Sequence, residues 1–121
     1  MIIAVDAMGG DNAPEVVVHG AIQACKELDC KIVLVGDLAT IYQCFESCNP
    51  GNEMSVYNCS EVIDMGESPI KAYKKKKDSS IRVAFELLKS GQVDAVVSAG
   101  NSGATMVAGI LHRGPKVWRQ H

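Results

Sequence analysis

Residues 2–21 read IIAVDAMGGDNAPEVVVHGA, and this stretch decides the fold. Residues 2–6 form an apolar run that favours a buried β-strand, and a glycine-rich loop over residues 7–14 follows directly. Pro14 is compatible with the first turn of a helix, and Asp11 or Asn12 is a suitable cap for that helix. The stretch therefore predicts a strand, a tight loop and a helix in immediate succession.

The same alternation continues along the chain. Residues 32–35 (IVLV) and 94–98 (DAVVS) predict two more buried strands, and residues 54–58 predict a weaker one. Residues 60–69 are expected to be irregular, and residues 69–77 to form a short basic helix or loop. Apolar residues at helical spacing predict a first helix through Val17, Ala21, Ala24, Cys25 and Leu28, and a second helix covers roughly residues 38–48. A third helix is predicted through Ile81, Ala84, Phe85 and Leu88; it starts at Ser79 or Ser80 and ends near Gly91. A fourth helix is expected to begin near Ala104.

Apolar strands that alternate with amphipathic helices predict an α/β fold, a doubly wound and mostly parallel sheet with helices on both faces. Ligands of such sheets bind outside the carboxyl ends of the strands. This rule selects two loops, residues 6–12 and 98–103, which we expect to lie on the same edge of the sheet and to face one crevice.

Composition narrows the class of protein. The chain has 121 residues, 47% of them hydrophobic, and a formal net charge of −2, so nothing favours a nucleic-acid partner. No apolar stretch is long enough for a membrane span, and the N-terminus does not resemble a secretory signal. The cysteine count is odd, 5, which favours reduced thiols in the cytoplasm, and buried thiols are favoured over a metal site.

The loop over residues 6–12 has the character of a ligand loop. Gly9 and Gly10 let the backbone approach a ligand closely, and amides at the start of a helix favour an anion. Asp6 and Asp11, however, oppose a bare phosphate and are suited to orienting a lysine, a hydroxyl or a metal-bound group. The alternative is a plain turn in which Asp11 caps the helix.

The loop over residues 98–103 has small residues at a second strand-to-helix turn. Its candidate binding residues are Ser98, Gly100, Asn101, Ser102 and Gly103. They leave free backbone N–H groups beside space for a ligand. An ordinary turn with Asn101 or Ser102 as a helix cap explains the pattern equally well.

A run of four lysines, residues 74–77, stands out against the mildly acidic chain. Most such runs are solvated faces. Because this run precedes a serine-rich helix start, we also consider Lys75, Lys76 and Lys77 as contacts for phosphate or for an acidic partner such as a carrier protein or a lipid head group.

Three stretches together resemble one family. They are IAVDAMGGDNAPEVVVHGA (3–21), SPIKAYKKKKDSS (68–80) and DAVVSAGNSGATMVAG (94–109). In this order they are similar to the N-terminal third of the PlsX-type phosphate acyltransferases of bacterial phospholipid synthesis. The resemblance implies a fold related to phosphate acetyltransferases and isocitrate dehydrogenases, and a cytoplasmic homodimer that can associate with the membrane. The implied reaction converts an acyl carrier protein thioester and inorganic phosphate to acyl phosphate, without metal or organic cofactor, and its general acid stays unassigned.

The resemblance covers residues 1–111, which we interpret as the N-terminal α/β part of such an enzyme. Residues 112–121 depart from the family pattern, and family chains are well over twice this length. We therefore expect a truncated or frameshifted product with little activity by itself. The alternatives are another phosphate acyltransferase of the same fold, a nucleotide-dependent dehydrogenase, whose glycine fingerprint is missing, and a non-catalytic binding module for an acidic partner.

Overall fold

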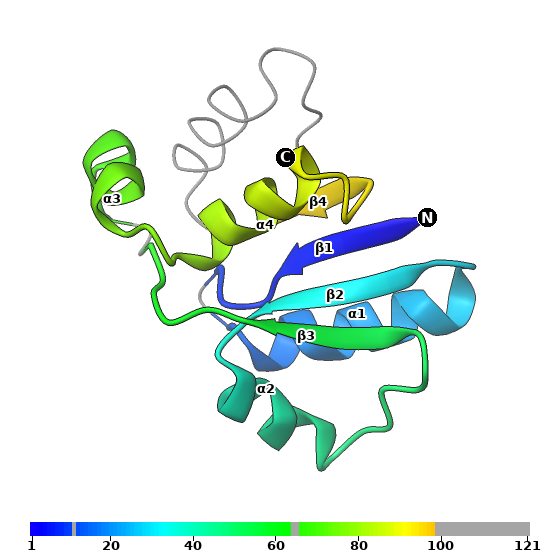
Figure 1. The fold of residues 1–121 in the computed structure, drawn as a ribbon. Coiled ribbons are helices and arrows are strands. Elements are labelled where there is room, and N and C mark those ends of the chain that lie inside the picture. Colours follow the sequence, from blue (N-terminus) through cyan, green and yellow to red (C-terminus); the bar gives the residue numbers. More distant parts are fainter. Residues whose placement is uncertain (11, 64–65, 99–121) are drawn as a thin grey trace.

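The computed structural model of the chain describes residues 1–10, 12–63 and 66–98. In these residues strands and helices alternate (Figure 1). In chain order the elements are β1 (Ile2–Asp6), α1 (Glu15–Glu27), β2 (Lys31–Gly36), α2 (Leu38–Phe45), β3 (Met54–Asn58), α3 (Pro69–Lys75), α4 (Ser80–Lys89) and β4 (Ala95–Val97). The four predicted strands are confirmed, although β2 is one residue longer at each end and β4 is one residue shorter at each end.

The four strands form one sheet in the order β3-β2-β1-β4. Each adjacent pair is parallel, and Ala4 of β1 lies opposite Val33 of β2 and Val96 of β4. Parallel neighbours need long crossovers, and the helices between the strands supply them. The predicted parallel sheet is confirmed.

The two faces of the sheet carry separate apolar clusters, because successive side chains of a strand point to opposite faces. Ala4 and Val35 belong to the cluster under α4, whereas Val5 and Leu34 belong to the cluster under α1 and α2. Figure 1 shows α4 on one side of the sheet and α1 and α2 on the other. The helices therefore cover both faces, as a doubly wound fold requires.

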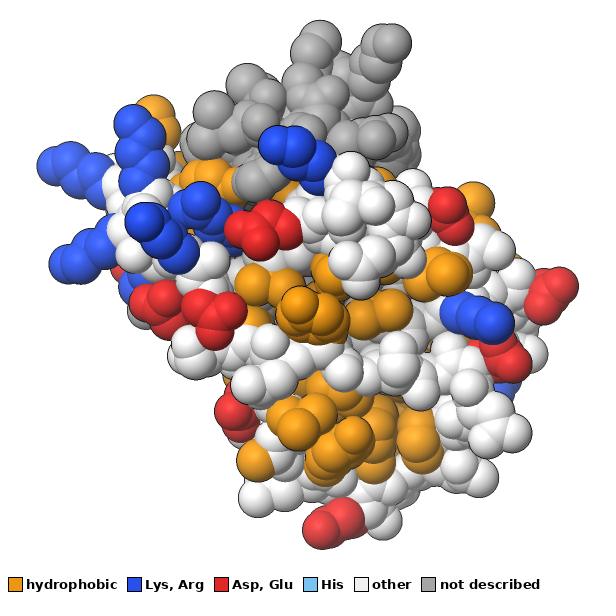
Figure 2. Space-filling model, in the orientation of Figure 1, with side chains coloured by type: hydrophobic (Ala, Val, Ile, Leu, Met, Phe, Trp, Pro, Cys, Tyr) orange, Lys and Arg blue, Asp and Glu red, His pale blue; other side chains and the backbone are white. Residues whose placement is uncertain are grey.

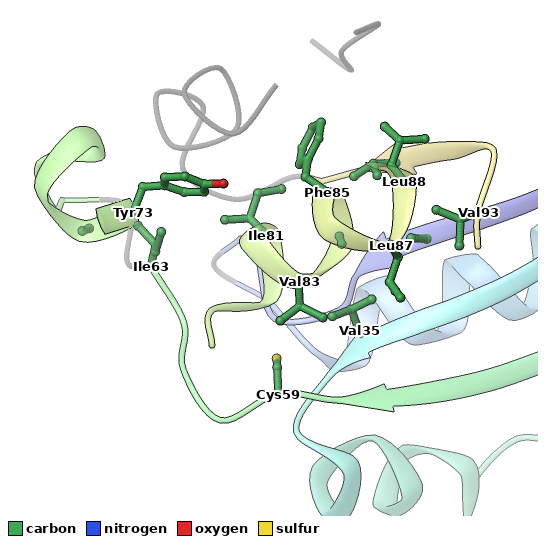
Figure 3. Packing of buried hydrophobic residues seen from close by; sticks show 14 residues of the cluster. Val35, Cys59, Ile63, Tyr73, Ile81, Val83, Phe85, Leu87, Leu88 and Val93 are labelled. Atoms are coloured by element: carbon green, nitrogen blue, oxygen red, sulfur yellow. The ribbon is translucent and has the colours of Figure 1, made fainter. Parts of the chain in front are cut away.

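Helix α4 has a broad apolar face and a narrower polar side that carries Arg82, Glu86 and Lys89. The predicted stripe of Ile81, Ala84, Phe85 and Leu88 is buried, and so are Val83 and Leu87. Figure 3 shows Val83 and Leu87 pointing toward Val35, while Ile81 and Phe85 point the other way. Because this apolar face is so wide, most of the α4 side chains are buried, and the helix is a central element of the fold.

The ends of α4 agree with the sequence. Ser79 occupies the cap position, and its hydroxyl accepts a hydrogen bond from the Arg82 N–H at 3.4 Å. Gly91 has a φ of 81° just beyond the last turn. Glycine is the residue that adopts this conformation without steric cost.

The predictions for α1 need correction. The helix begins at Glu15, with Pro14 in the cap position and no side-chain cap, so Asn12 does not cap it. Its buried residues are Val18, Ala21 and Ile22, while Leu28 is 61% exposed. Leu28 follows the last turn with an extended backbone, which takes its side chain off the helical face.

Helix α2 is shorter than predicted. It begins after Asp37, whose carboxylate accepts from the Thr40 N–H at 3.1 Å, and it ends at Phe45. Cys48 therefore lies beyond the helix, where its thiol donates to the carbonyl of Cys44 at 3.1 Å. The five cysteines, including these two, are free thiols.

Candidate functional site at the ends of β1 and β4

The strand order reverses between β1 and β4. From β1 the chain moves outward through β2 to β3 and then returns to the other side of β1 to form β4. In open parallel sheets, ligands bind beside such a reversal, outside the carboxyl ends of the strands. Asp6 ends β1 and Ser98 follows β4, so these two residues mark the place.

Asp6 joins three segments of the chain. One carboxylate oxygen accepts from the Ser98 hydroxyl at 2.9 Å, and the other accepts from the Met8 N–H at 3.1 Å. The Ser80 hydroxyl and the Gly9 N–H also hydrogen-bond to this carboxyl group. The Asp6 carboxyl group thus connects the end of β1, the first turn of α4 and the residue after β4.

Burial controls the protonation of Asp6, which is 4% exposed. The loss of solvation raises its pKa above the usual 3.8, and hydrogen bonds from Ser80, Ser98, Met8 and Gly9 oppose that rise. Of the three groups that the sequence suggested for this carboxylate to orient, a lysine, a hydroxyl or a metal-bound group, the described residues place two serine hydroxyls on it. A buried carboxylate with this set of donors is suited to fixing the geometry of the loops around it.

The loop after β1 is tightly built. The Ala7 N–H donates to the carbonyl of Val35 at 3.0 Å, and Gly10 has a φ of 96°. The side chain of Met8 lies over Gly36, where an added Cβ would be 2.8 Å from the Met8 Cγ. Glycine adopts the positive φ of Gly10 without steric cost. The peptide bond between Ala13 and Pro14 is cis.

The described residues contain part of the predicted site. Asp6, Gly9, Gly10 and Ser98 are described, and Asp6 and Ser98 meet directly. The other predicted site residues, namely Asp11, Gly100, Asn101, Ser102 and Gly103, lie outside the described residues, as does the helix expected near Ala104. The adjacency of the two strand ends is therefore established, and the shared crevice of the two loops stays a prediction.

Ser80 also belongs to the group of residues around Asp6, although its sequence position predicted only a helix cap. It is 1% exposed, its N–H donates to the carbonyl of Glu61 at 3.0 Å, and its hydroxyl reaches Asp6. Ser79 supplies the cap, which frees the next serine for Asp6. Two serines ahead of a strongly apolar helix were the available signal, but the partner of the second depends on tertiary structure.

The lysine run divides into residues with different surroundings. Lys75 and Lys77 are exposed, whereas Lys76 is half-buried. The Lys76 ammonium pairs with Glu67 at 2.8 Å and donates to the carbonyl of Val62 at 2.7 Å. Lys76 is therefore not a freely solvated charge, because its ammonium group ties α3 to the segment before it, and the predicted contact of these lysines with phosphate or an acidic partner stays a prediction.

The described residues provide no metal centre. Within residues 1–10, 12–63 and 66–98, no three His, Cys, Asp or Glu side chains are grouped as metal ligands. None of the helices in the described part of the chain has both the length and the apolar character needed to cross a membrane.

Comparison with protein families shows which family the chain matches. The family described as "Fatty acid synthesis protein" matches residues 1–117, nearly the whole chain. The chain belongs to the fatty acid synthesis protein family. The resemblance found in the three sequence stretches is therefore confirmed at the level of the family.

Curated relatives carry the name phosphate acyltransferase. The protein from Geobacter sulfurreducens is 52% identical over 112 residues, which are 92% of this chain and 32% of that protein. The protein from Geotalea daltonii is 53% identical with the same coverage. The protein from Thermosynechococcus vestitus is 48% identical over 112 residues, 93% of this chain and 33% of that protein. This member of the fatty acid synthesis protein family thus spans about a third of the length of these relatives.

Proposed function

We propose that this chain is the N-terminal portion of a phosphate acyltransferase that makes acyl phosphate from an acyl carrier protein thioester and inorganic phosphate in bacterial phospholipid synthesis. The observation that carries the proposal is the roughly half identity to proteins named phosphate acyltransferase across the segment that contains Asp6 and Ser98. The partners in this proposal are acyl carrier protein, phosphate and a second copy of the chain, in the cytoplasm with peripheral contact to the membrane.

The chemistry is an acyl transfer. A phosphate oxygen attacks the thioester carbonyl carbon and forms the new C–O bond, the C–S bond breaks, and the thiolate leaves and takes up a proton. Such a step needs a phosphate held against the thioester and donors for the developing oxyanion. Backbone N–H groups of residues 9–11 and 100–103 are our candidates for both tasks.

Asp6 has a positioning role in this proposal. Its carboxylate already accepts hydrogen bonds from two hydroxyls and two N–H groups, and a negative charge there would repel phosphate. Ser98 is the better candidate for contact with the substrate, because it is partly exposed and begins the second loop. Asp6 would then act through Ser98.

A chimera tests the proposal. Residues 1–111 would replace the matching segment of the Geobacter sulfurreducens relative, and acyl phosphate would be trapped with hydroxylamine. We expect a rate within about tenfold of that of the parent enzyme, and a further loss of about tenfold or more for Ser98→Ala, the scale of a lost transition-state donor. A folded chimera that binds the carrier protein but forms no acyl phosphate would refute the proposal.

Two other functions are separated by the same assay. A non-catalytic binding module is favoured by the basic surface of α3 and would yield binding without acyl phosphate. Another phosphate acyltransferase of this fold would use acyl coenzyme A in preference to the carrier protein thioester. The rates of acyl phosphate formation from the two thioesters at equal concentration distinguish these functions.

A further inference from the structure

Helix α3 has two faces of opposite character. At 3.6 residues per turn, Ala72, Tyr73 and Lys76 fall on one side, and Ile70, Lys71, Lys74 and Lys75 fall on the other. Ala72 and Tyr73 are buried at 5% and 2% exposure, whereas Ile70 is 56% exposed. We call the side formed by Ile70, Lys71, Lys74 and Lys75 the outer face.

The inner face holds α3 firmly on the rest of the protein. Figure 3 shows the Tyr73 ring beside Ile63 and Ile81. The Arg82 guanidinium lies 5.0 Å from the centre of that ring and donates to the Tyr73 carbonyl at 3.2 Å. Lys76 adds its bonds to Glu67 and Val62. These contacts fix the orientation of the outer face, so a partner need not order it on binding.

The outer face carries uncompensated positive charge. The two salt bridges among the described residues use Lys76 and Arg82, so Lys71, Lys74 and Lys75 take part in neither. Lys71 lies three and four positions before Lys74 and Lys75, where like charges repel along a helix. Figure 2 shows the lysines gathered on one projection of the molecule. Negative charge on a partner would relieve the repulsion.

We infer that the outer face of α3 docks an acidic protein, with Ile70 as the apolar contact among the lysines. A single phosphate fits less well, because the lysines stand on a convex helix and do not converge on one point. A bilayer also fits less well, because membrane helices bury a broad apolar face. The apolar side of α3 is already buried against the protein, which leaves only Ile70.

The three lysines that the sequence predicted as contacts have different positions relative to the outer face. Lys75 lies on the outer face, Lys76 is part of the attachment, and Lys77 follows the helix and lines a groove with Tyr57 and Glu86. Lys71, Lys74 and Ile70, which the sequence did not single out, join Lys75 as expected contacts for the partner. The choice of acyl carrier protein as the acidic probe rests on the proposed function, whereas the acidic character of the partner does not.

Binding of this chain to carrier protein without an acyl group tests the inference by titration calorimetry. We expect Lys74→Glu to weaken binding at least threefold, and a Lys71, Lys74 and Lys75 to Glu triple variant at least tenfold, with a smaller dependence on salt. Lys26→Glu on α1 is the matched control, since it makes the same change of charge on an exposed lysine elsewhere. It should leave the affinity within about twofold, and Ile70→Ser should weaken binding without changing its salt dependence.

Three results would overturn the inference. The first is that the parent chain does not bind carrier protein, and the second is that Lys74→Glu and Lys26→Glu lose equal affinity for it. The third is that the chain binds vesicles made of equal parts of phosphatidylglycerol and phosphatidylcholine but does not bind carrier protein. Acyl phosphate formation from a small acyl thioester, which needs no docking, separates this inference from the proposed function. If the chimera does not carry out that reaction but the lysine variants weaken binding as expected, only the proposed function is wrong. If the reaction proceeds but the lysine variants bind carrier protein as tightly as the parent chain, only the proposed docking surface is wrong.

Discussion

Asp6 shows how one buried carboxylate brings several segments together. Its hydrogen bonds reach Met8 and Gly9 in the loop directly after β1, and also Ser80 and Ser98, which lie far from Asp6 in the sequence. Burial disfavours the charged form of the carboxyl group, which is why its pKa rises. The stability of the folded protein therefore depends on pH through this residue.

We expect Asp6→Asn to change how stability responds to pH. Because the folded-state pKa of Asp6 is raised above 3.8, its contribution is fully present below 3.8 and is lost as the pH rises through the folded-state pKa. The parent protein should therefore lose free energy of unfolding, relative to Asp6→Asn, as the pH increases from 3.8. Urea unfolding of both proteins across this range measures the difference. Parallel stability curves would show that Asp6 titrates normally.

Cys59 should be a poor nucleophile in the folded protein. Burial, followed by the nearby carboxylates of Asp6, Asp78 and Asp37, raises the pKa of its thiol from 9.0 to about 12. A rise of that size reduces the thiolate population about a thousandfold at neutral pH. Alkylation by iodoacetamide, followed by mass spectrometry, should modify Cys59 far more slowly than the half-buried Cys30, with the difference vanishing in urea. Equal rates in the folded protein would contradict the burial of this thiol.

At the scale of elements, α3 depends on its side-chain attachments, because its seven residues are too few for a stable isolated helix. Lys76→Met keeps the apolar stem but removes the bonds to Glu67 and Val62. We expect it to lower the free energy of unfolding by about 1 kcal/mol, since the pair is partly exposed. Lys75→Met, an exposed neighbour, should stay within about 0.5 kcal/mol of the parent. Equal effects in urea denaturation would mean that the Lys76 bridge does not hold α3.

Two glycines predict opposite effects of the same substitution. Gly20 lies inside α1 in open space, so Gly20→Ala should stabilise the protein by about 0.5–1 kcal/mol. Gly91 has a φ of 81° after α4, where alanine is strained, so Gly91→Ala should destabilise it by about 1 kcal/mol. Thermal unfolding of both variants provides the measurement. Two shifts of the same sign would contradict either the open helical surroundings of Gly20 or the positive φ of Gly91.

At the scale of the whole molecule, β1 occupies the centre. It is paired on both sides and lies between the two apolar clusters. Hydrogen exchange should therefore be slowest at β1 amides such as Ala4 and Val5, which open only on global unfolding. The amides of α3 should exchange orders of magnitude faster through local opening. Equal protection in α3 and β1 would indicate that α3 unfolds only together with the sheet.

Much of this architecture was predictable from residues 2–21 and the strands that follow. The apolar runs specified where strands lie, because a strand buried on both faces must be continuously apolar. Ser79 and Gly91 specified the ends of α4, because capping depends on the residue itself. The parallel sheet and the meeting of Asp6 with the end of β4 then follow from connectivity, since parallel strands bring their carboxyl ends to one edge.

Other features were decided only by tertiary structure. The burial of Val83 and Leu87, the partnership of Ser80 with Asp6, and the attachment of Lys76 to Glu67 depend on which segment packs against each residue. The exposure of Leu28 likewise depends on where α1 ends. Local patterns report conformational preferences along the chain, whereas burial and hydrogen-bond partners are set by contacts between residues distant in sequence. For that reason, four adjacent lysines of one chemical type came to have different roles.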